Sequence, residues 1–276
     1  MKKNYLFNKT VVITGASGGI GFSIAKLLIE KYDCKVIGIA RNEKKILNSI
    51  STIREDKKEN FTYRLFDVSK KENWCNFASY LQENNIFIDI LINNAGFMLP
   101  FTKFEKCSDN EIQEIVNTNF YSNVYSIKAL MPLLKKSTTP SIINVCSSAG
   151  LCAVVGQSMY SATKSAMRSF TECLTEEYKK EFYIAGVYPG FIKTDIMNRL
   201  DVDQKSQKLM NSFMMPLEKA SKKIVKKISK KKKRIVLGLD GGFMNISYRL
   251  FPNLTLSIIT KVLKSSKMHI FDGVFK

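Results

Sequence analysis

The sequence has a single histidine and no cysteine pair at metal-binding spacing. His269 stands alone in 276 residues, so histidine-dependent catalysis and a histidine-ligated metal are not expected. The six cysteines include no C-x-x-C pair, which favours free thiols in a reducing, cytoplasmic compartment. The first residues lack an apolar run long enough for a secretory signal. These absences exclude a disulfide-stapled secreted domain, and no metal ligands are assigned.

Acidic residues are scarce relative to basic ones: 24 Asp and Glu against 43 Lys and Arg give a formal net charge of +19. The densest basic run, residues 221–234, keeps Ile224, Val225 and Ile228 at helical spacing, which predicts a surface helix with a solvated basic face. No aromatic residues interleave with these cations, so nucleic acid is not expected as a partner. A general lysine enrichment of the proteome would explain the excess. Lysines near an anionic bilayer also contribute about 1 kcal/mol each, so peripheral membrane contact stays open.

Internal repeats and Pro/Gly/Ser-rich linkers are absent too, and the pattern indicates one α/β domain. Short apolar runs typical of buried strands lie at residues 10–14, 35–40, 62–66, 88–92, 141–146, 183–188 and 234–237. Helical patterns separate these runs, and such alternation predicts a doubly wound parallel sheet in three α/β/α layers. Ser108 and Glu111 form a capping-box signature that opens the long helix carrying Asn119.

The C-terminal region is strongly apolar over residues 243–263. Arg249 and Pro252 interrupt this stretch, so it does not make a convincing membrane-spanning helix. Two interpretations remain: an interfacial amphipathic helix, or a lid and oligomer-contact segment over a substrate cleft. We expect a catalytic domain over residues 1–240 and a C-terminal helical extension over residues 241–276 that packs on or near the cleft.

A glycine-rich turn follows the first expected strand, in the order TVVIT, GASGGIG and then a helical pattern. This context is typical of dinucleotide binding: Gly15 permits the tight turn, Gly19 lets the backbone approach a pyrophosphate, and Gly21 allows close helix packing. The phosphate would lie at the helix N-terminus, where unpaired N–H groups and the helix dipole favour an anion.

The end of the second expected strand, KVIGIARN, predicts which dinucleotide is preferred. NAD-specific sites place an acidic residue there to bind the ribose 2′-hydroxyl, whereas an arginine accepts the 2′-phosphate of NADP. Ala40 fills the acidic position and Arg41 follows it, and Ser17 can add a hydrogen bond. The sequence therefore predicts NADP(H).

Tyr160 and Lys164 stand four residues apart in YSATK, within a helical pattern free of proline and glycine. They would project from one face of the helix. A free phenol has a pKa of about 10 and needs a nearby cation to exchange protons near neutrality. We expect Lys164 to lower the pKa of Tyr160, which would act as general acid and base, with Ser147 hydrogen-bonded to the reacting oxygen. Such a pair also occurs by chance on many helices, so the other motifs decide its meaning.

Five ordered motifs, spanning about residues 8–195, resemble those of the short-chain dehydrogenase/reductase family. They are TGASGGIG, NNAG, NTNFYSN, Ser147 with YSATK, and YPGFIKT at residues 188–194. The resemblance implies a Rossmann fold and a catalytic tetrad of Asn119, Ser147, Tyr160 and Lys164. Lys164 would also hold the nicotinamide ribose, and Asn119 would anchor a water. Ser122 departs from the glycine common in the family, which should affect local helix packing rather than chemistry.

The same motifs imply most of the cofactor site. Asp67 and Val68 correspond to residues near the adenine, and Thr194 to one that binds the nicotinamide carboxamide, although Thr194 could simply cap a helix. The expected cofactor-binding residues are Gly15, Ser17, Gly19, Ile20, Gly21, Arg41, Asp67, Val68, Asn94, Ala95, Gly96, Tyr160, Lys164, Pro189, Gly190, Ile192 and Thr194.

The resemblance implies an NADP(H)-dependent oxidoreductase that interconverts a ketone or aldehyde and an alcohol. Residues 191–215 correspond to the substrate loop and are rich in Met, Leu and Phe, which favours a hydrophobic substrate such as a steroid, retinoid or long-chain lipid. One alternative is a 3-oxoacyl reductase of fatty acid synthesis. Another is a non-catalytic NADP-binding or membrane-associated scaffold, against which the intact tetrad argues. A homodimer or homotetramer through the helices bearing Asn119 and Tyr160 is expected.

Overall fold

Seven parallel strands form a single sheet in the order β3-β2-β1-β4-β5-β6-β7. The computed structural model of the protein describes residues 4–194, 206 and 214–276. The strands are β1 (Thr10–Thr14), β2 (Lys35–Ala40), β3 (Phe61–Leu65), β4 (Ile90–Asn93), β5 (Ser141–Val145), β6 (Tyr183–Pro189) and β7 (Arg234–Leu237). The seven expected strands are confirmed, with several ends shifted by one or two residues. Strand order reverses between β1 and β4, and at such a point a doubly wound sheet opens a ligand-binding crevice.

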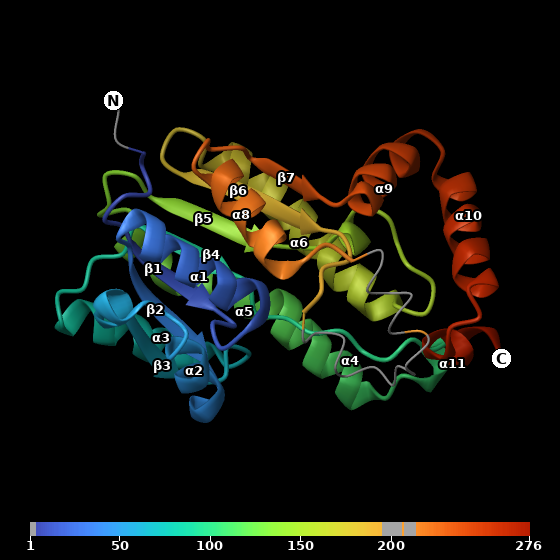
Figure 1. The fold of residues 1–276 in the computed structure, drawn as a ribbon, viewed down its shortest axis with the longest axis horizontal. Coiled ribbons are helices and arrows are strands. Elements are labelled where there is room, and N and C mark those ends of the chain that lie inside the picture. The colour runs from blue at the N-terminus through green and yellow to red at the C-terminus, as the bar shows by residue number, and fades with distance from the viewer. Residues whose placement is uncertain (1–3, 195–205, 207–213) are drawn as a thin grey trace.

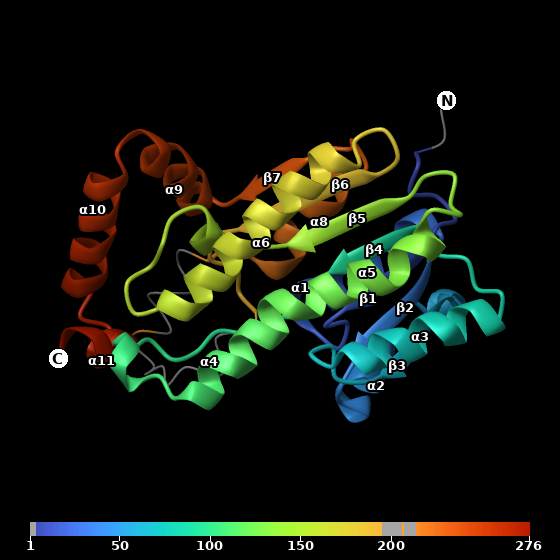
Figure 2. The same ribbon diagram turned by 180° about the vertical axis from the view of Figure 1, so that it is seen from behind.

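Helices cover both faces of this sheet and complete the three expected layers. On one face lie α1 (Gly19–Tyr32) and α8 (Leu217–Ile228), as Figure 1 shows. On the other lie α3 (Lys71–Glu83), α5 (Ser122–Leu134) and α6 (Ser158–Glu177), seen in Figure 2. The short helix α2 (Glu43–Ile50) follows β2.

Both faces of the central strands are buried, which explains their continuous apolar sequences. Successive side chains of a strand point to opposite faces. Val11 and Ile13 accordingly join the core beneath α1 and α8, whereas Val12 joins the core beneath α3 and α5. The expected apolar face of the basic helix is confirmed as well, because Ile224, Val225 and Ile228 of α8 are buried.

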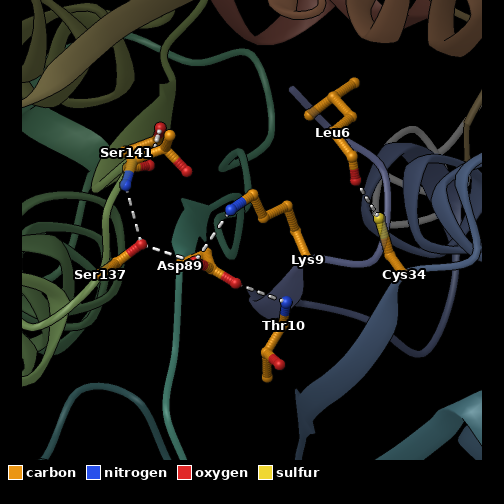
Figure 3. Close-up of polar contacts among 8 residues, drawn as sticks. Leu6, Lys9, Thr10, Cys34, Asp89, Ser137 and Ser141 are labelled. Atoms are coloured by element: carbon orange, nitrogen blue, oxygen red, sulfur yellow. Dashed lines mark hydrogen bonds and ion pairs between the residues drawn. The ribbon is translucent and has the colours of Figure 1, made fainter. Parts of the chain in front are cut away.

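Asp89, just before β4, connects the amino ends of neighbouring strands, and Figure 3 shows its polar contacts. Its carboxylate accepts hydrogen bonds from the Thr10 backbone N–H at 3.0 Å, Lys9 Nζ at 3.3 Å and Ser137 Oγ at 2.5 Å. Nearby, Cys34 Sγ donates to the carbonyl oxygen of Leu6 at 3.1 Å. These contacts stabilise the fold far from the crevice.

A π-helical turn, Asn117–Tyr121, joins α4 (Asp109–Val116) to α5 in one continuous helical stretch. The predicted capping box is confirmed at the start of α4, where Ser108 and Glu111 exchange hydrogen bonds. Ser122 makes a local helix contact, because its buried hydroxyl donates to the Thr118 carbonyl oxygen at 2.6 Å. The wide turn buries Asn119 completely, and turns of this kind often occur at functional sites.

The chain ends in helices α9 (Leu239–Leu250), α10 (Pro252–Ser265) and α11 (Asp272–Phe275). The expected boundary between residues 240 and 241 falls in the first turn of α9. α9 ends at Leu250, and Pro252 begins α10 at a helix position where its missing N–H costs nothing. In both views α9 and α10 extend beyond the carboxyl edge of the sheet (Figures 1 and 2). No helix in the described part of the chain is long and apolar enough to cross a membrane.

Candidate active site

A cavity of about 450 Å³ lies along the carboxyl ends of the strands. It brings together residues from all five sequence motifs. Of the expected catalytic and cofactor-binding residues, only Gly21 and Asn119 do not line it. The expected substrate loop, residues 191–215, lies mainly outside the described residues, although Phe191, Ile192, Thr194 and Met214 contribute to the cavity wall.

The glycine turn forms one end of this cavity. Gly15 and Gly19 have positive φ angles of 65° and 53°, which side chains rarely allow. A Cβ atom on Gly21 would lie 2.5 Å from both Gly15 O and Asn94 Nδ2, so helix and strand are too close for any side chain. Asn94 holds the turn from the other side, because its Nδ2 donates to Thr14 O at 2.9 Å.

The first turn of α1 fits a phosphate group. Ser17, Gly19 and Ile20 line the cavity, and no side chain caps the N-terminus of α1. Its backbone N–H groups are therefore available to an anion. Among the described residues, the atom nearest to a Cβ added on Gly19 would belong to Thr194, at 3.9 Å, so this turn faces the opposite wall across open space.

Basic and polar residues surround the opening beyond β2. Arg41 is exposed at the rim, next to Asn42 and Lys45. Lys45 was not assigned to the site from the sequence, although Asn42, a typical N-cap residue, could have indicated its position. Asn42 is the N-cap of α2, and its Oδ1 accepts from the Lys45 backbone N–H at 2.8 Å. That geometry places Lys45 in the first turn of α2, on the cavity side. Neither Ala40 nor its two neighbours carries a carboxylate that would repel a phosphate.

The loop after β3 forms the adjacent wall with Asp67 and Val68. Asp67 Oδ1 accepts from the Ser69 backbone N–H at 2.9 Å, and Trp74 Nε1 donates to the Val68 carbonyl oxygen at 2.8 Å. The loop is therefore held in place by its own hydrogen bonds, which leaves the Val68 side chain as an apolar surface for a planar ring.

Tyr160 and Lys164 lie in α6, and both are almost fully buried. Lys164 Nζ lies 5.7 Å from the centroid of the Tyr160 ring and donates to the Val145 carbonyl oxygen at 3.2 Å. Burial raises the pKa of Tyr160 to about 12, and a hydrogen bond with Ser147 acts in the opposite direction. Burial also lowers the pKa of Lys164. The expectation that Lys164 lowers the pKa of the phenol is not met here, because desolvation raises that pKa.

Asn119 supports the site from behind the cavity wall. Its side chain pairs with the backbone of Phe97, with Nδ2 donating to Phe97 O at 2.9 Å and Oδ1 accepting from Phe97 N at 3.0 Å. A Cβ atom on Gly96 would lie 3.0 Å from Asn119 Oδ1 and 3.3 Å from Lys164 Nζ. The loop after β4 therefore passes between these two side chains. The Asn119 carbonyl oxygen accepts from Asn123 Nδ2 at 2.8 Å, which holds the following turn of the helix against it.

Asp240, in the first turn of α9, is a second residue that sequence reasoning missed. Its Oδ2 accepts from the Phe191 backbone N–H at 2.7 Å. A side chain on Gly190 or Gly238 would collide with the Asp240 carboxylate, so both glycines are required for this approach. The carboxylate thereby ties the C-terminal helices to the Pro189–Gly190 segment of the cavity wall. Only the flanking glycines in GLDGG could have signalled this contact.

Much of the remaining wall is apolar, although Thr118, Ser148 and Gln157 also line it. Its apolar side chains include Phe97, Met98, Phe101, Val154, Met214 and Met244. The chain end supports this wall, because Ile270, Phe271 and Val274 pack in the same buried cluster as Phe97 and Phe101. The cavity thus has a polar half at the glycine turn and an apolar half next to Tyr160.

A family model for short chain dehydrogenases matches residues 9–205. A 3-oxoacyl-(acyl-carrier-protein) reductase of Chlamydia trachomatis is 33% identical over 205 residues, which cover 73% of this chain and 81% of that protein. A short-chain dehydrogenase of Sphingobium yanoikuyae, solved with NADPH, has 22% identity and a TM-score of 0.75, covering 93% of this chain and 95% of that one. A Burkholderia phymatum short-chain dehydrogenase/reductase, solved with NAD, has 19% identity and a TM-score of 0.77, covering 96% and 97%. Because the family match spans more than half of its sequence, the chain belongs to the short-chain dehydrogenase family of oxidoreductases.

Proposed function

We propose that the protein is an NADP(H)-dependent oxidoreductase that interconverts a ketone or aldehyde and an alcohol on a hydrophobic substrate. The observation that carries this proposal is the meeting of Tyr160, Ser147 and Lys164 with an uncapped, glycine-lined helix N-terminus in one cavity. A phosphate-binding turn and a proton-transfer group within one cavity suit a nicotinamide and a carbonyl compound side by side.

The catalytic roles follow from charge and position. When bound, the nicotinamide supplies the hydride chemistry. Tyr160 donates a proton to the carbonyl oxygen during reduction and takes it back during oxidation, while Ser147 hydrogen-bonds the same oxygen. The phenol is protonated near neutrality, as proton donation to a carbonyl oxygen requires. Lys164 Nζ has donors left beyond Val145 O, which suit a ribose hydroxyl.

The preference for NADP(H) is supported by Arg41 and Lys45 at the rim of the cavity. A guanidinium binds a phosphate through paired, charge-assisted hydrogen bonds, and an ammonium adds a second cation. The related structures include one with NADPH and one with NAD, so the family membership leaves this choice to local residues. Replacing Arg41 with aspartate should raise the KM for NADPH far more than the KM for NADH. Equal effects on both would contradict the preference.

The substrate class is supported by the apolar half of the cavity, which favours a steroid, retinoid or long-chain lipid. A second candidate is a 3-oxoacyl reductase, which the name of the Chlamydia trachomatis relative favours. NADPH consumption across steroid ketones, long-chain aldehydes, 3-oxoacyl thioesters and small aldehydes separates these readings.

The decisive control for catalysis is Tyr160→Phe, which keeps the ring and removes the proton. It should abolish turnover while NADPH binding, followed by fluorescence, persists. Wild-type turnover by this variant would refute the proposed chemistry. Binding of NADPH without turnover of any carbonyl by the unchanged protein would favour a nucleotide-binding scaffold instead.

We also infer that the protein forms a homodimer or homotetramer through α5 and α6. Tyr121 and Tyr125 support this inference, because their rings stack with centroids 5.8 Å apart and Tyr121 is 40% exposed. Sedimentation of the parent and of Tyr121→Glu tests the assembly, and identical monomeric behaviour would refute it.

A further inference from the structure

We propose that helices α9 and α10 form a docking surface for an anionic lipid bilayer. This inference goes beyond the enzymatic reaction. One part of it, the delivery of a lipid-soluble carbonyl compound from that bilayer, rests on the proposed function.

The first support is an unusual concentration of exposed apolar side chains. More than half of the large hydrophobic side chains exposed on the described part of the chain belong to residues 239–262, with exposed fractions from 41% to 95%. They are Leu239, Phe243, Ile246, Leu250, Phe251, Leu254, Ile258 and Val262. Elsewhere such side chains, including Phe87 and Phe104, are scattered along the chain, which is normal for a protein surface.

The spacing of these side chains gathers them on one face of each helix. Leu239, Phe243, Ile246 and Leu250 follow one another at intervals of four, three and four residues along α9, which places them in one row. Leu254, Ile258 and Val262 recur every fourth residue along α10. Each helix therefore has an outward apolar stripe, and both helices stand at the same end of the molecule (Figures 1 and 2).

Cations flank these stripes. Arg249, Lys261, Lys264 and Lys267 are all exposed. At about 100° per residue, Lys261 lies on the same side of α10 as Leu254, two turns further along the helix. The carboxylates in residues 239–276 belong to Asp240 and Asp272, and both have partners: Asp240 accepts from Phe191 N, and Asp272 pairs with Lys276 at 2.9 Å. The surface thus combines exposed apolar side chains with an excess of positive charge.

An anionic bilayer complements this combination. Amphipathic helices with basic flanks lie in the plane of the interface, with the apolar face at the acyl boundary and the cations among anionic headgroups. A second copy of this chain is a poorer occupant, because a two-fold contact would bring identical patches together and oppose cation to cation. The whole chain, with its net charge of +19, adds to the attraction of an anionic surface.

The position of α9 connects this surface with the cavity. Met244 points inward from α9, is buried and lines the apolar half of the cavity, whereas Phe243 and Ile246 of the same helix are exposed. One helix therefore separates the proposed membrane contact from the place where the carbonyl compound would bind. Phe191, which is 39% exposed and tied to Asp240, lies at the rim between them.

Vesicle co-sedimentation of the full chain tests the docking. Phosphatidylcholine vesicles with phosphatidylserine should bind the protein, and phosphatidylcholine alone should bind it much less. The double variant Ile246→Asp, Ile258→Asp should weaken binding at least about tenfold, because each substitution removes an apolar contact and adds a repelled charge. The matched control is Phe87→Asp with Phe104→Asp, which changes net charge equally on exposed sites outside the patch.

A charge test complements the apolar one. Lys261→Glu with Lys264→Glu should weaken binding to the anionic vesicles more than Lys230→Glu with Lys232→Glu, which changes net charge equally beyond the end of α8. Circular dichroism and thermal midpoints verify that each variant folds.

Three outcomes would overturn the docking surface. The first is that the parent protein does not bind vesicles containing phosphatidylserine. The second is that the Ile246/Ile258 double variant binds them as tightly as the parent does. The third is an assembly in solution that only this variant disrupts, which would identify a second copy as the occupant. NADPH consumption with a short water-soluble carbonyl compound is the independent readout, and it should be equal in parent and double variant. Vesicle binding without turnover of any carbonyl compound in the substrate panel would refute the proposed function alone, and turnover without vesicle binding would refute the docking alone.

Discussion

Replacing Asp240 with alanine is expected to raise the KM for NADP(H) about tenfold, because it removes the carboxylate that fixes the Phe191 backbone N–H beside the cavity. Phe191 follows Pro189 and Gly190, which line the cavity. Without its acceptor this N–H bonds to water, and the segment can take other conformations. A bound nucleotide would then have to order a wall that is already ordered in the parent.

The magnitude follows from the contact itself. A hydrogen bond to a charged acceptor contributes about 1.5–3 kcal/mol. The Asp240 contact is exposed, so solvent screening reduces its contribution to roughly the lower end of that range. About 1.4 kcal/mol corresponds to a tenfold change in an equilibrium constant. The substitution should weaken cofactor binding but change the free energy of unfolding little, since it removes a partly exposed surface contact.

Steady-state kinetics of Asp240→Ala and Asp240→Asn test this reasoning. Asparagine keeps a carbonyl oxygen at the same place, so Asp240→Asn should recover most of the cofactor affinity. Urea unfolding shows whether either variant loses global stability. Unchanged KM values in Asp240→Ala, or equal losses in both variants, would mean that the contact does not order the cavity wall.

Three further predictions concern the turn, the opposite edge of the sheet and pH. Gly21→Ala should abolish dinucleotide binding, measured by fluorescence titration, because the added Cβ would lie 2.5 Å from a backbone oxygen. The control Gly242→Ala should bind normally, because no described atom lies within 4 Å of its added Cβ. Asp89→Ala should lower the free energy of unfolding by about 2–4 kcal/mol in urea titrations, since three donors lose their acceptor. The control Asp56→Ala, which breaks an exposed ion pair, should lower it by under about 1 kcal/mol. A loss for Asp89→Ala no larger than that of the control would contradict the assignment. Burial raises the pKa of Cys34 from 9.0 to about 12, so the thiol loses its proton in the unfolded state first. The free energy of unfolding should therefore fall as pH rises from 9 to 12. In Cys34→Ala this fall should be shallower, and a fall as steep as that of the parent would contradict the prediction.

The fold was largely predictable because each buried parallel strand is a continuous apolar run with helical spacing on either side. The exact ends of the strands were less predictable, because a residue belongs to a strand only if it pairs with the neighbouring strand. Phe61, for example, belongs to β3 because it pairs with Val36 of β2. The π-helical turn at residues 117–121 has no local sequence signature and could not be foreseen.

The site was predictable where its residues are close in sequence and unpredictable where distant segments meet. Gly15, Gly19 and Tyr160 belong to short motifs whose geometry is local. The contact of Asp240 with Phe191 joins residues 49 positions apart, and no periodicity reports it. Burial around Tyr160 is likewise a property of the whole fold, so its raised pKa could not be inferred from its spacing to a lysine.

The π-helical turn holds about one residue more than an α-helical turn does, within the stretch that joins α4 to α5. Removing one residue between 117 and 121 would therefore restore a regular α-helix and leave α4 and α5 nearly in phase. The narrower turn would no longer place Asn119 against the Phe97 backbone, although the helix itself would remain intact. A chain of this fold that is one residue shorter in this stretch would differ from this one by a single gap in an alignment, yet it would have lost the support behind its loop after β4.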